Sequence, residues 1–315
     1  MYRSVFHRIA LRIVGFFMNL YAVLFPKAAA HKAYQIFART PKPVLRGKEL
    51  QFMETARQVP RRAGEHEILE YHWGAEGNKW ILLAYGWGYN AGRWRHFVPQ
   101  LVEAGYRVIA YDPPGHGLNQ RGDRFLNALI NKNIQLDLIK TYGTPEVVIG
   151  HSFGGASAVM ALRDLPRLQR PKRLVVMASF SATRPIFDEY RRALGLWYWV
   201  HLNFIRYIEQ MIHAPLESLD MARQSAELDN VDGLLVHDPF EKVTRFKHAE
   251  RYHSYWPGSA LLRAPHAGHH LGKPEVTEAV IEFAIRGTLP REATFNTAPL
   301  AAGHDLVRYF VGLEH

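Results

Sequence analysis

The 315-residue sequence contains no cysteine, and this absence removes several kinds of chemistry at once. Without thiols, the chain has no disulfide bond, no thiolate metal ligand and no cysteine nucleophile. It also has no internal repeat and no low-complexity tract. Hydrophobic residues make up 48% of the chain and charged residues 22%, so it can bury a core. The length suits a large α/β domain that carries an insertion.

Acidic residues are few compared with basic ones. The sequence has 29 Asp and Glu against 39 Lys and Arg, which gives a net charge of +10. Basic proteins often bind nucleic acid or anionic membranes. Here Lys and Arg are spread along the whole chain and no nucleic-acid motif is present. We therefore interpret the charge as a solvated basic surface and expect no nucleic-acid partner.

The N-terminal segment has no uninterrupted apolar run of the length typical of a transmembrane helix. Arg3, Arg8 and Arg12 precede the apolar stretch 13–25, and an alanine run follows, as in a signal peptide. The stretch is short for a transmembrane helix, and Arg12 and Asn19 interrupt it. It also fits an amphipathic helix that lies on a membrane or caps a pocket. We favour an uncleaved helix of a cytoplasmic protein, with peripheral membrane contact as an open alternative.

Strands and helices are expected to alternate along most of the chain. An exposed strand is expected at 66–74, because polar and apolar residues alternate there. Buried parallel strands are expected where apolar runs enter loops, at 79–85, 107–112, 147–149, 172–180, 233–238 and 260–265. Helices are expected at 99–105, 125–142, 153–165 and 274–285. This alternation predicts an α/β fold, with a mainly parallel central sheet and helices on both faces.

Two stretches depart from the alternation. Pro41 and Pro43 make residues 39–50 an irregular linker. Residues 181–230 contain no strand but hold aromatic helical sequence, so we predict a helical lid insertion that shapes a substrate pocket. A buried aromatic helix explains the same pattern. The expected organisation is an N-terminal helical segment and linker (1–45), an α/β domain (46–290) that contains this lid, and a C-terminal tail (291–315).

The segment "GHSFGG" at 150–155 lies between a strand and a helix. This pattern is typical of a nucleophile elbow, in which Ser152 is held at the tip of a sharp turn. Glycines at 150 and 154 remove side chains that would crowd the neighbouring backbone. A glycine-rich turn with a capping serine is the simpler explanation. The strand before it and the helix after it favour a catalytic serine.

A serine nucleophile needs a base, an acid that orients the base, and donors for the oxyanion. With an elbow serine, the acid and then the histidine follow along the chain. His269 is our candidate base because Gly268 lets its loop turn towards the elbow; the other candidates are His270 and then His266. The candidate acids are Asp238, at the end of the strand 233–238, and Glu241, three residues further on in the loop.

The oxyanion hole requires two backbone N–H groups. One is expected from Phe153, directly after the nucleophile, and the other from Trp87 in the loop "YGWG". Gly86 and Gly88 allow that loop to approach the substrate closely. A plain glycine turn is the alternative interpretation.

Together these motifs resemble the α/β-hydrolase superfamily, in particular its serine esterases and lipases. The resemblance rests on "YGWG" (85–88), "DPPGHG" (112–117), "GHSFGG" (150–155), "LLVHDPFEKV" (234–243) and "GHH" (268–270), in the order of the family. It covers roughly residues 80–286. An N-terminal helical segment of some bacterial members also resembles "FPKAAAHKAYQIFARTPK" (25–42), which argues against cleavage there.

The resemblance implies a Ser–His–acid triad and an acyl-enzyme intermediate. It places Glu241 where the family has its acid and Asp238 where the family has a glycine. Most members have Asp at the acid position. Tyr85 stands where the family has a mainly structural His, so the departure affects loop packing more than chemistry. Because residue 152 is Ser, the branches with an Asp nucleophile (dehalogenases and epoxide hydrolases) are disfavoured.

The sequence therefore predicts a hydrolase of carboxylic esters that needs no metal or organic cofactor. The aromatic insertion suggests a small-molecule ester with an apolar group. A thioesterase or an acyltransferase would use the same triad. A membrane-associated binding protein that kept the fold without turnover is an alternative of another class.

Overall fold

The computed structural model describes residues 5–77, 79–119 and 124–290, so the expected tail at 291–315 lies outside the described part. The described chain forms two compact units. In the described part of the chain, the larger unit comprises Thr40–Ser181 and residues 221–290. The smaller unit comprises the helices before Thr40 and the segment Ala182–Asp220.

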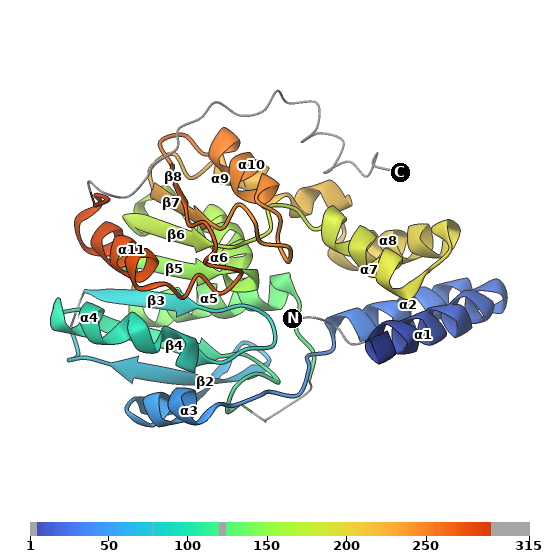
Figure 1. The fold of residues 1–315 in the computed structure, drawn as a ribbon, viewed down its shortest axis with the longest axis horizontal. Helices are drawn as coiled ribbons and strands as arrows, with labels where there is room; N and C mark the ends of the chain where they lie inside the picture. Colours follow the sequence, from blue (N-terminus) through green and yellow to red (C-terminus); the bar gives the residue numbers. More distant parts are fainter. Residues whose placement is uncertain (1–4, 78, 120–123, 291–315) are drawn as a thin grey trace. The chain divides into compact units, whose positions relative to one another are not determined.

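The larger unit is built around an eight-stranded sheet with the order β1-β2-β4-β3-β5-β6-β7-β8 (Figure 1). β2 pairs antiparallel with β1 and β4, and every other pairing is parallel. The strands are β1 (Arg57–Ala63), β2 (His66–Trp73), β3 (Trp80–Ala84), β4 (Arg107–Asp112), β5 (Val147–His151), β6 (Arg173–Met177), β7 (Asp232–His237) and β8 (Ala260–Arg263).

Helices cover both faces of this sheet, as expected. α4 (Val98–Glu103) and α11 (Pro274–Arg286) lie on one face, and α5 (Ala128–Tyr142) and α6 (Phe153–Asp164) on the other (Figure 1). Every residue of β3 and β5 is buried, which explains their continuous apolar sequences. The other described α-helices of this unit are α3 (Gly47–Glu54), α9 (Met221–Ser225) and α10 (Lys247–Tyr255), and it also contains the short 3-10 helices η1 (Ala91–His96) and η2 (Arg167–Gln169).

The N-terminal part of the sheet differs from the sequence prediction. β2 was expected to be exposed, but most of it is buried because helices pack on both of its faces: Phe52 of α3 stacks on Trp73, and Tyr142 of α5 contacts His72. Its polar residues Glu70 and His72 are satisfied internally: His72 Nε2 lies 2.8 Å from a Glu70 carboxylate oxygen, and Arg61 of β1 also pairs with Glu70. Internal ion pairing therefore gives a buried strand the alternating pattern of an exposed one.

Two elements at this end were not predicted. The linker expected at 39–50 ends at Arg46, because α3 begins at Gly47, and β1 follows that helix. β1 was missed because its sequence, "RQVPRRA", is polar and contains a proline. Both features are compatible with its place at the edge of the sheet.

The smaller unit is helical. It contains α1 (Val5–Leu24), α2 (Pro26–Ala38), α7 (Arg184–Leu194) and α8 (Tyr198–Ile212). The rings of Phe37, Phe187 and Phe204 contact one another in edge-on geometry, with centroids 5.1–6.2 Å apart. The aromatic insertion therefore packs with the N-terminal helices. Among the described helices, none is long and apolar enough to cross a membrane.

Candidate active site

The strand–turn–helix around Ser152 has the geometry that the sequence motif predicts. Ser152 has φ 51° and ψ −121°, a conformation that non-glycine residues rarely adopt. A Cβ at Gly150 would lie 2.5 Å from Gly155 Cα, and one at Gly154 would lie 2.3 Å from Ala84 O. Both contacts are too short for any side chain, so the two glycines are required for this turn. The serine is consequently held between the end of β5 and the start of α6.

His269 lies beside this serine, in the loop after β8. Its Nε2 is 3.2 Å from Ser152 Oγ. His151 holds this loop in place, because its Nε2 donates a hydrogen bond to the carbonyl oxygen of His269 at 2.8 Å. Burial lowers the pKa of His151 far below its ordinary value, so this ring is neutral and its Nδ1 bears no proton.

Glu241 is on the other side of the His269 ring. One of its carboxylate oxygens lies 3.2 Å from His269 Nδ1, and its side chain is almost fully buried. Burial alone would raise the pKa of Glu241, but hydrogen bonds with His237 and His269 outweigh it and hold the pKa far below the usual range. The ionised carboxylate keeps the proton of His269 on Nδ1, which leaves the lone pair of Nε2 facing Ser152.

Of the other three candidate residues, only His270 has a ring contact with His269, edge-on with centroids 6.2 Å apart, and in the described part of the chain none of the three is hydrogen-bonded to Ser152 or to the His269 ring. Asp238 accepts hydrogen bonds from the N–H groups of Phe240 (2.9 Å) and Gly268 (2.7 Å). His266 stacks on Phe240, with ring centroids 4.7 Å apart. His270 packs near Tyr89, and its carbonyl oxygen accepts a hydrogen bond from Arg93.

The two candidate oxyanion donors come from neighbouring elements. Phe153 is the first residue of α6, and Trp87 lies in the loop after β3, the strand paired with β5. Their rings meet edge-on at 5.3 Å. The N–H of Gly88 donates to His116 Nε2 at 2.9 Å, which fixes this loop next to Trp87. Burial lowers the pKa of His116 to about 4, so its ring stays neutral and keeps this acceptor at neutral pH.

Tyr85, which stands where the family has a histidine, fixes the loop after β3 through its hydroxyl group. Its hydroxyl donates to Asp112 at 2.7 Å, and the N–H of Ala91 donates to the same carboxylate oxygen at 3.0 Å. Tyr71 donates to the other oxygen at 2.6 Å. The tyrosine therefore ties the loop after β3 to the end of β4 in place of a histidine.

Three histidines that support the site were not identified from the sequence. His151 holds the backbone of His269, His116 holds Gly88, and His237 contacts Glu241 at 3.3 Å. His116 and His151 lie inside the motifs "DPPGHG" and "GHSFGG", which are signals for their positions but not for their partners. His237 carries no signal beyond its place at the end of a strand.

No group of three or more His, Asp or Glu side chains in residues 5–77, 79–119 and 124–290 is arranged to hold a metal ion. The described side chains instead form a linear series of contacts from carboxylate to imidazole to hydroxyl. That arrangement can move a proton away from Ser152 and stabilise the resulting imidazolium. The larger unit therefore has an α/β fold in which a serine, a histidine and a carboxylate lie in the order of a candidate catalytic triad.

The sequence profile described as the alpha/beta hydrolase family matches residues 81–308, about 70% of the chain. The chain belongs to this family. It is also similar to the Escherichia coli 2-hydroxy-6-oxononadienedioate/2-hydroxy-6-oxononatrienedioate hydrolase, with 33% identity over 135 residues. That match covers 40% of this chain and 44% of the relative, less than half of either protein.

Solved structures show the same fold at low sequence identity. A bacterial membrane phospholipase A superposes with a TM-score of 0.56 and 16% identity, over 89% of this chain and 99% of that one. A meta-cleavage product hydrolase from Pseudomonas fluorescens superposes with a TM-score of 0.53 and 16% identity, over 74% and 98%. The α/β-hydrolase fold of the chain is therefore established, and the chain is a hydrolase of this family whose substrate these similarities leave open.

Proposed function

We propose that this protein hydrolyses carboxylic esters through a Ser152–His269–Glu241 triad. The observation that carries the proposal is the continuous series of contacts from Ser152 Oγ to His269 Nε2, at 3.2 Å, and from His269 Nδ1 to Glu241, also at 3.2 Å. Both distances are at the long end of the range for a hydrogen bond. Such contacts commonly tighten only when substrate is bound.

In this mechanism, Ser152 Oγ attacks the ester carbonyl carbon while its proton moves to His269 Nε2. The carbonyl oxygen becomes an oxyanion that accepts hydrogen bonds from the backbone N–H groups of Phe153 and Trp87. His269 then gives its proton to the departing alkoxide, so an alcohol leaves and the acyl group stays on Ser152. Water, deprotonated by His269, attacks the acyl-enzyme and releases the carboxylic acid with Ser152 restored.

A second candidate function is hydrolysis of a carbon–carbon bond. It is favoured by the 33% identity to the Escherichia coli 2-hydroxy-6-oxononadienedioate hydrolase over 135 residues. The same serine and histidine would serve that reaction. We prefer ester hydrolysis because the site as described needs no group beyond the triad and two N–H donors.

The direct test is turnover of p-nitrophenyl esters of increasing acyl length and of a phospholipid, itself a carboxylic ester, with a 2-hydroxy-6-oxo-dienedioate and an acyl-CoA thioester as competing substrate classes. The phospholipid is included because one of the similar structures is that of a membrane phospholipase A. The proposal expects the highest kcat/KM on a carboxylic ester. A higher kcat/KM on the dienedioate or the thioester would replace it with the corresponding alternative.

Ser152→Ala is the matched variant for this test. Removal of a triad nucleophile typically lowers kcat by about 10⁶-fold, while binding and the oxyanion hole remain. Rapid labelling of the parent, but not of this variant, by a fluorophosphonate probe would separate an activated serine from a binding protein. A folded Ser152→Ala protein with near-parental kcat would refute the triad.

A further inference from the structure

The first helix of the smaller unit has an unusual surface. Within residues 8–24 of α1, where burial is described, the buried residues form a narrow stripe of Gly15, Met18, Asn19 and Ala22. A Cβ at Gly15 would lie 1.8 Å from the carbonyl oxygen of Leu194, so the helix is packed closely against the end of α7. This stripe is the side of α1 that packs within the smaller unit. The rest of the described helix surface is not covered by that unit.

The uncovered part of α1 is apolar rather than polar. Phe17 is 63% exposed and Leu24 is 73% exposed. The other exposed large apolar residues of this helix and the residue after it are Ile9, Ile13, Val14, Phe16, Leu20, Tyr21, Val23 and Phe25. A contiguous apolar surface of this kind is rare on a protein without a partner and commonly marks an interaction site.

An aromatic segment of the insertion extends this surface. Asn19 joins the two parts: its Oδ1 accepts from the N–H of Trp197 at 2.9 Å, and its Nδ2 donates to the carbonyl oxygen of Gly195 at 3.0 Å. Trp197, Tyr198 and Trp199, at the start of α8, are also exposed. Tryptophan and tyrosine are the residues favoured where apolar lipid meets water.

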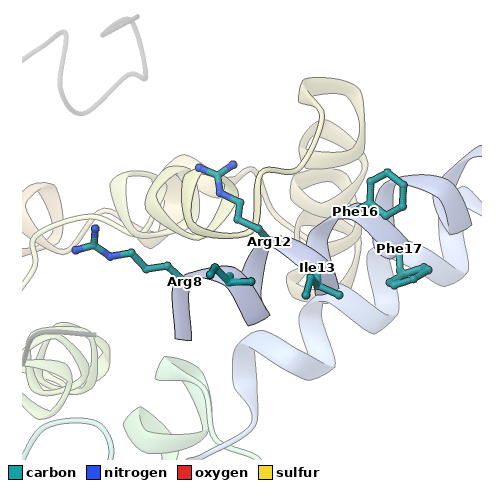
Figure 2. Close-up of a pocket in the computed structure, with 6 residues that line it drawn as sticks. Arg8, Arg12, Ile13, Phe16 and Phe17 are labelled. Atoms are coloured by element: carbon teal, nitrogen blue, oxygen red, sulfur yellow. The ribbon is translucent and has the colours of Figure 1, made fainter. Parts of the chain in front are cut away.

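The charges beside this surface are positive. Figure 2 shows Arg8 and Arg12 one turn apart on α1, followed by Ile13, Phe16 and Phe17. The first 48 residues of the chain include nine Lys and Arg and no Asp or Glu. In the part of the chain that the structure describes, no carboxylate pairs with Arg8 or Arg12.

We propose that α1 and the segment Trp197–Trp199 form a docking surface for an anionic phospholipid membrane, with α1 lying along the headgroup region. The apolar side chains enter the boundary between headgroups and acyl chains, and the arginines contact lipid phosphates. Long arginine side chains reach the headgroups while their apolar stems stay near the acyl chains. The charge pattern favours this occupant over a second copy of the chain, since two copies would bring two basic helices together.

The test is flotation of the full-length protein with phosphatidylcholine vesicles, with and without phosphatidylglycerol, at low and high salt. We expect binding to the anionic vesicles that weakens several-fold at high salt. The double variant Phe17→Ser/Leu24→Ser should bind at least tenfold more weakly, because two large apolar side chains no longer enter the lipid. Trp197→Ser should also weaken binding, which tests the insertion separately from α1.

Two further variants make the test specific. Leu168→Ser is the matched control, because Leu168 is 99% exposed but lies in the larger unit, and its binding should equal that of the parent. Arg8→Gln should weaken binding and reduce its salt dependence. Equal binding of the parent and the double variant, or binding that ignores phosphatidylglycerol, would overturn the proposal.

The same surface could instead bind a second copy of the chain, and the test distinguishes this outcome. A dimer in light scattering that the double variant dissociates, together with no vesicle binding, would assign this surface to self-association and overturn membrane docking. The proposal does not rest on ester hydrolysis. Hydrolysis of a water-soluble ester without vesicles should be the same in the parent and the double variant, so loss of catalysis and loss of docking are distinguishable.

Discussion

The carboxylate of Asp238 accepts a hydrogen bond from the N–H of Gly268 at 2.7 Å, one residue before His269 in the chain. The carboxylate of Glu241, in contrast, faces the His269 ring at 3.2 Å. The two acids that the sequence left as alternatives therefore lie beside the same loop but contact different parts of it. One contacts the backbone and the other contacts the imidazole.

This difference predicts unequal effects of two isosteric substitutions. Glu241→Gln should lower kcat on an activated ester by about 10²–10⁴-fold, since the amide no longer stabilises the imidazolium. Asp238→Asn should lower it by about tenfold or less, because the amide oxygen can still accept from Gly268. Steady-state kinetics, with circular dichroism to verify folding, checks the pair. A larger loss for Asp238→Asn would assign the acid to the end of β7.

His151 is expected to act as a positioning residue. Its Nε2 donates to the carbonyl oxygen of His269, so His151→Phe keeps a ring of similar size and removes that hydrogen bond. A shift of His269 by a fraction of an ångström should lower kcat by about 10–100-fold while KM changes little. His151→Gln, which retains a donor, should recover part of the loss. A rise in KM with unchanged kcat would show that the residue shapes the substrate pocket instead.

Backbone strain at Ser152 predicts a difference in stability between two inactive variants. Ser152→Ala keeps the Cβ and therefore the cost of φ 51° and ψ −121°. Ser152→Gly removes that cost, which should raise the free energy of unfolding by about 1–2 kcal/mol relative to Ser152→Ala. The gain is partly offset by the greater freedom of glycine in the unfolded chain. Urea unfolding of both proteins measures the difference, and a glycine variant no more stable than the alanine variant would mean that the turn stores little strain.

A buried histidine away from the triad should make stability depend on pH. Burial lowers the pKa of His248 to about 3, and its Nδ1 accepts from the N–H of Ser181 at 2.9 Å. In the unfolded chain a histidine has an ordinary pKa near 6.5. Its contribution is therefore complete above about pH 6.5 and is lost as the pH falls from there towards 3, by about 1.4 kcal/mol per pH unit.

The corresponding experiment compares unfolding free energies between about pH 7.5 and 5. His248→Gln should show a flatter pH dependence, by close to one proton, because glutamine does not titrate but still accepts from Ser181. The control is His213→Asn, since His213 is exposed and asparagine tolerates its left-handed backbone at φ 53°. Parallel profiles for the parent and His248→Gln would contradict the prediction.

The sequence predicted the larger unit well where strands are buried on both faces. β3 and β5 are continuous apolar runs that end in glycine-containing loops, and such runs have few alternatives to a central parallel strand. β1 and β2 were harder to predict from the sequence, because the charged residue Glu70 is buried in β2 and is stabilised there by Arg61 and His72. A buried carboxylate whose cationic partner, such as Arg61, lies on another strand cannot be distinguished from a surface residue in the sequence.

The candidate site was likewise predicted only in part. The motif spacing identified Ser152, His269 and Glu241 as candidates, because each follows a strand that ends at the same edge of a parallel sheet. It left the roles of Glu241 and Asp238 open. The two carboxylates are three residues apart in the chain, and this spacing does not show which of them contacts the His269 ring and which contacts the backbone. The contacts of His151 and His116 could not be predicted, because each joins segments that are far apart in the chain. His237 lies only four residues from Glu241, but its place at the end of a strand does not show which group its ring contacts.

The smaller unit brings together α1 and α2 with α7 and α8, which are separated by roughly 145 residues of the larger unit. Synthesis at about 5–20 residues per second therefore leaves the first two helices without α7 and α8 for on the order of 10–30 s. During that interval the buried alanines of α2 and the apolar side of α1 are open to any other partner. A membrane or chaperone near the ribosome would thus meet α1 and α2 before their partners α7 and α8 exist.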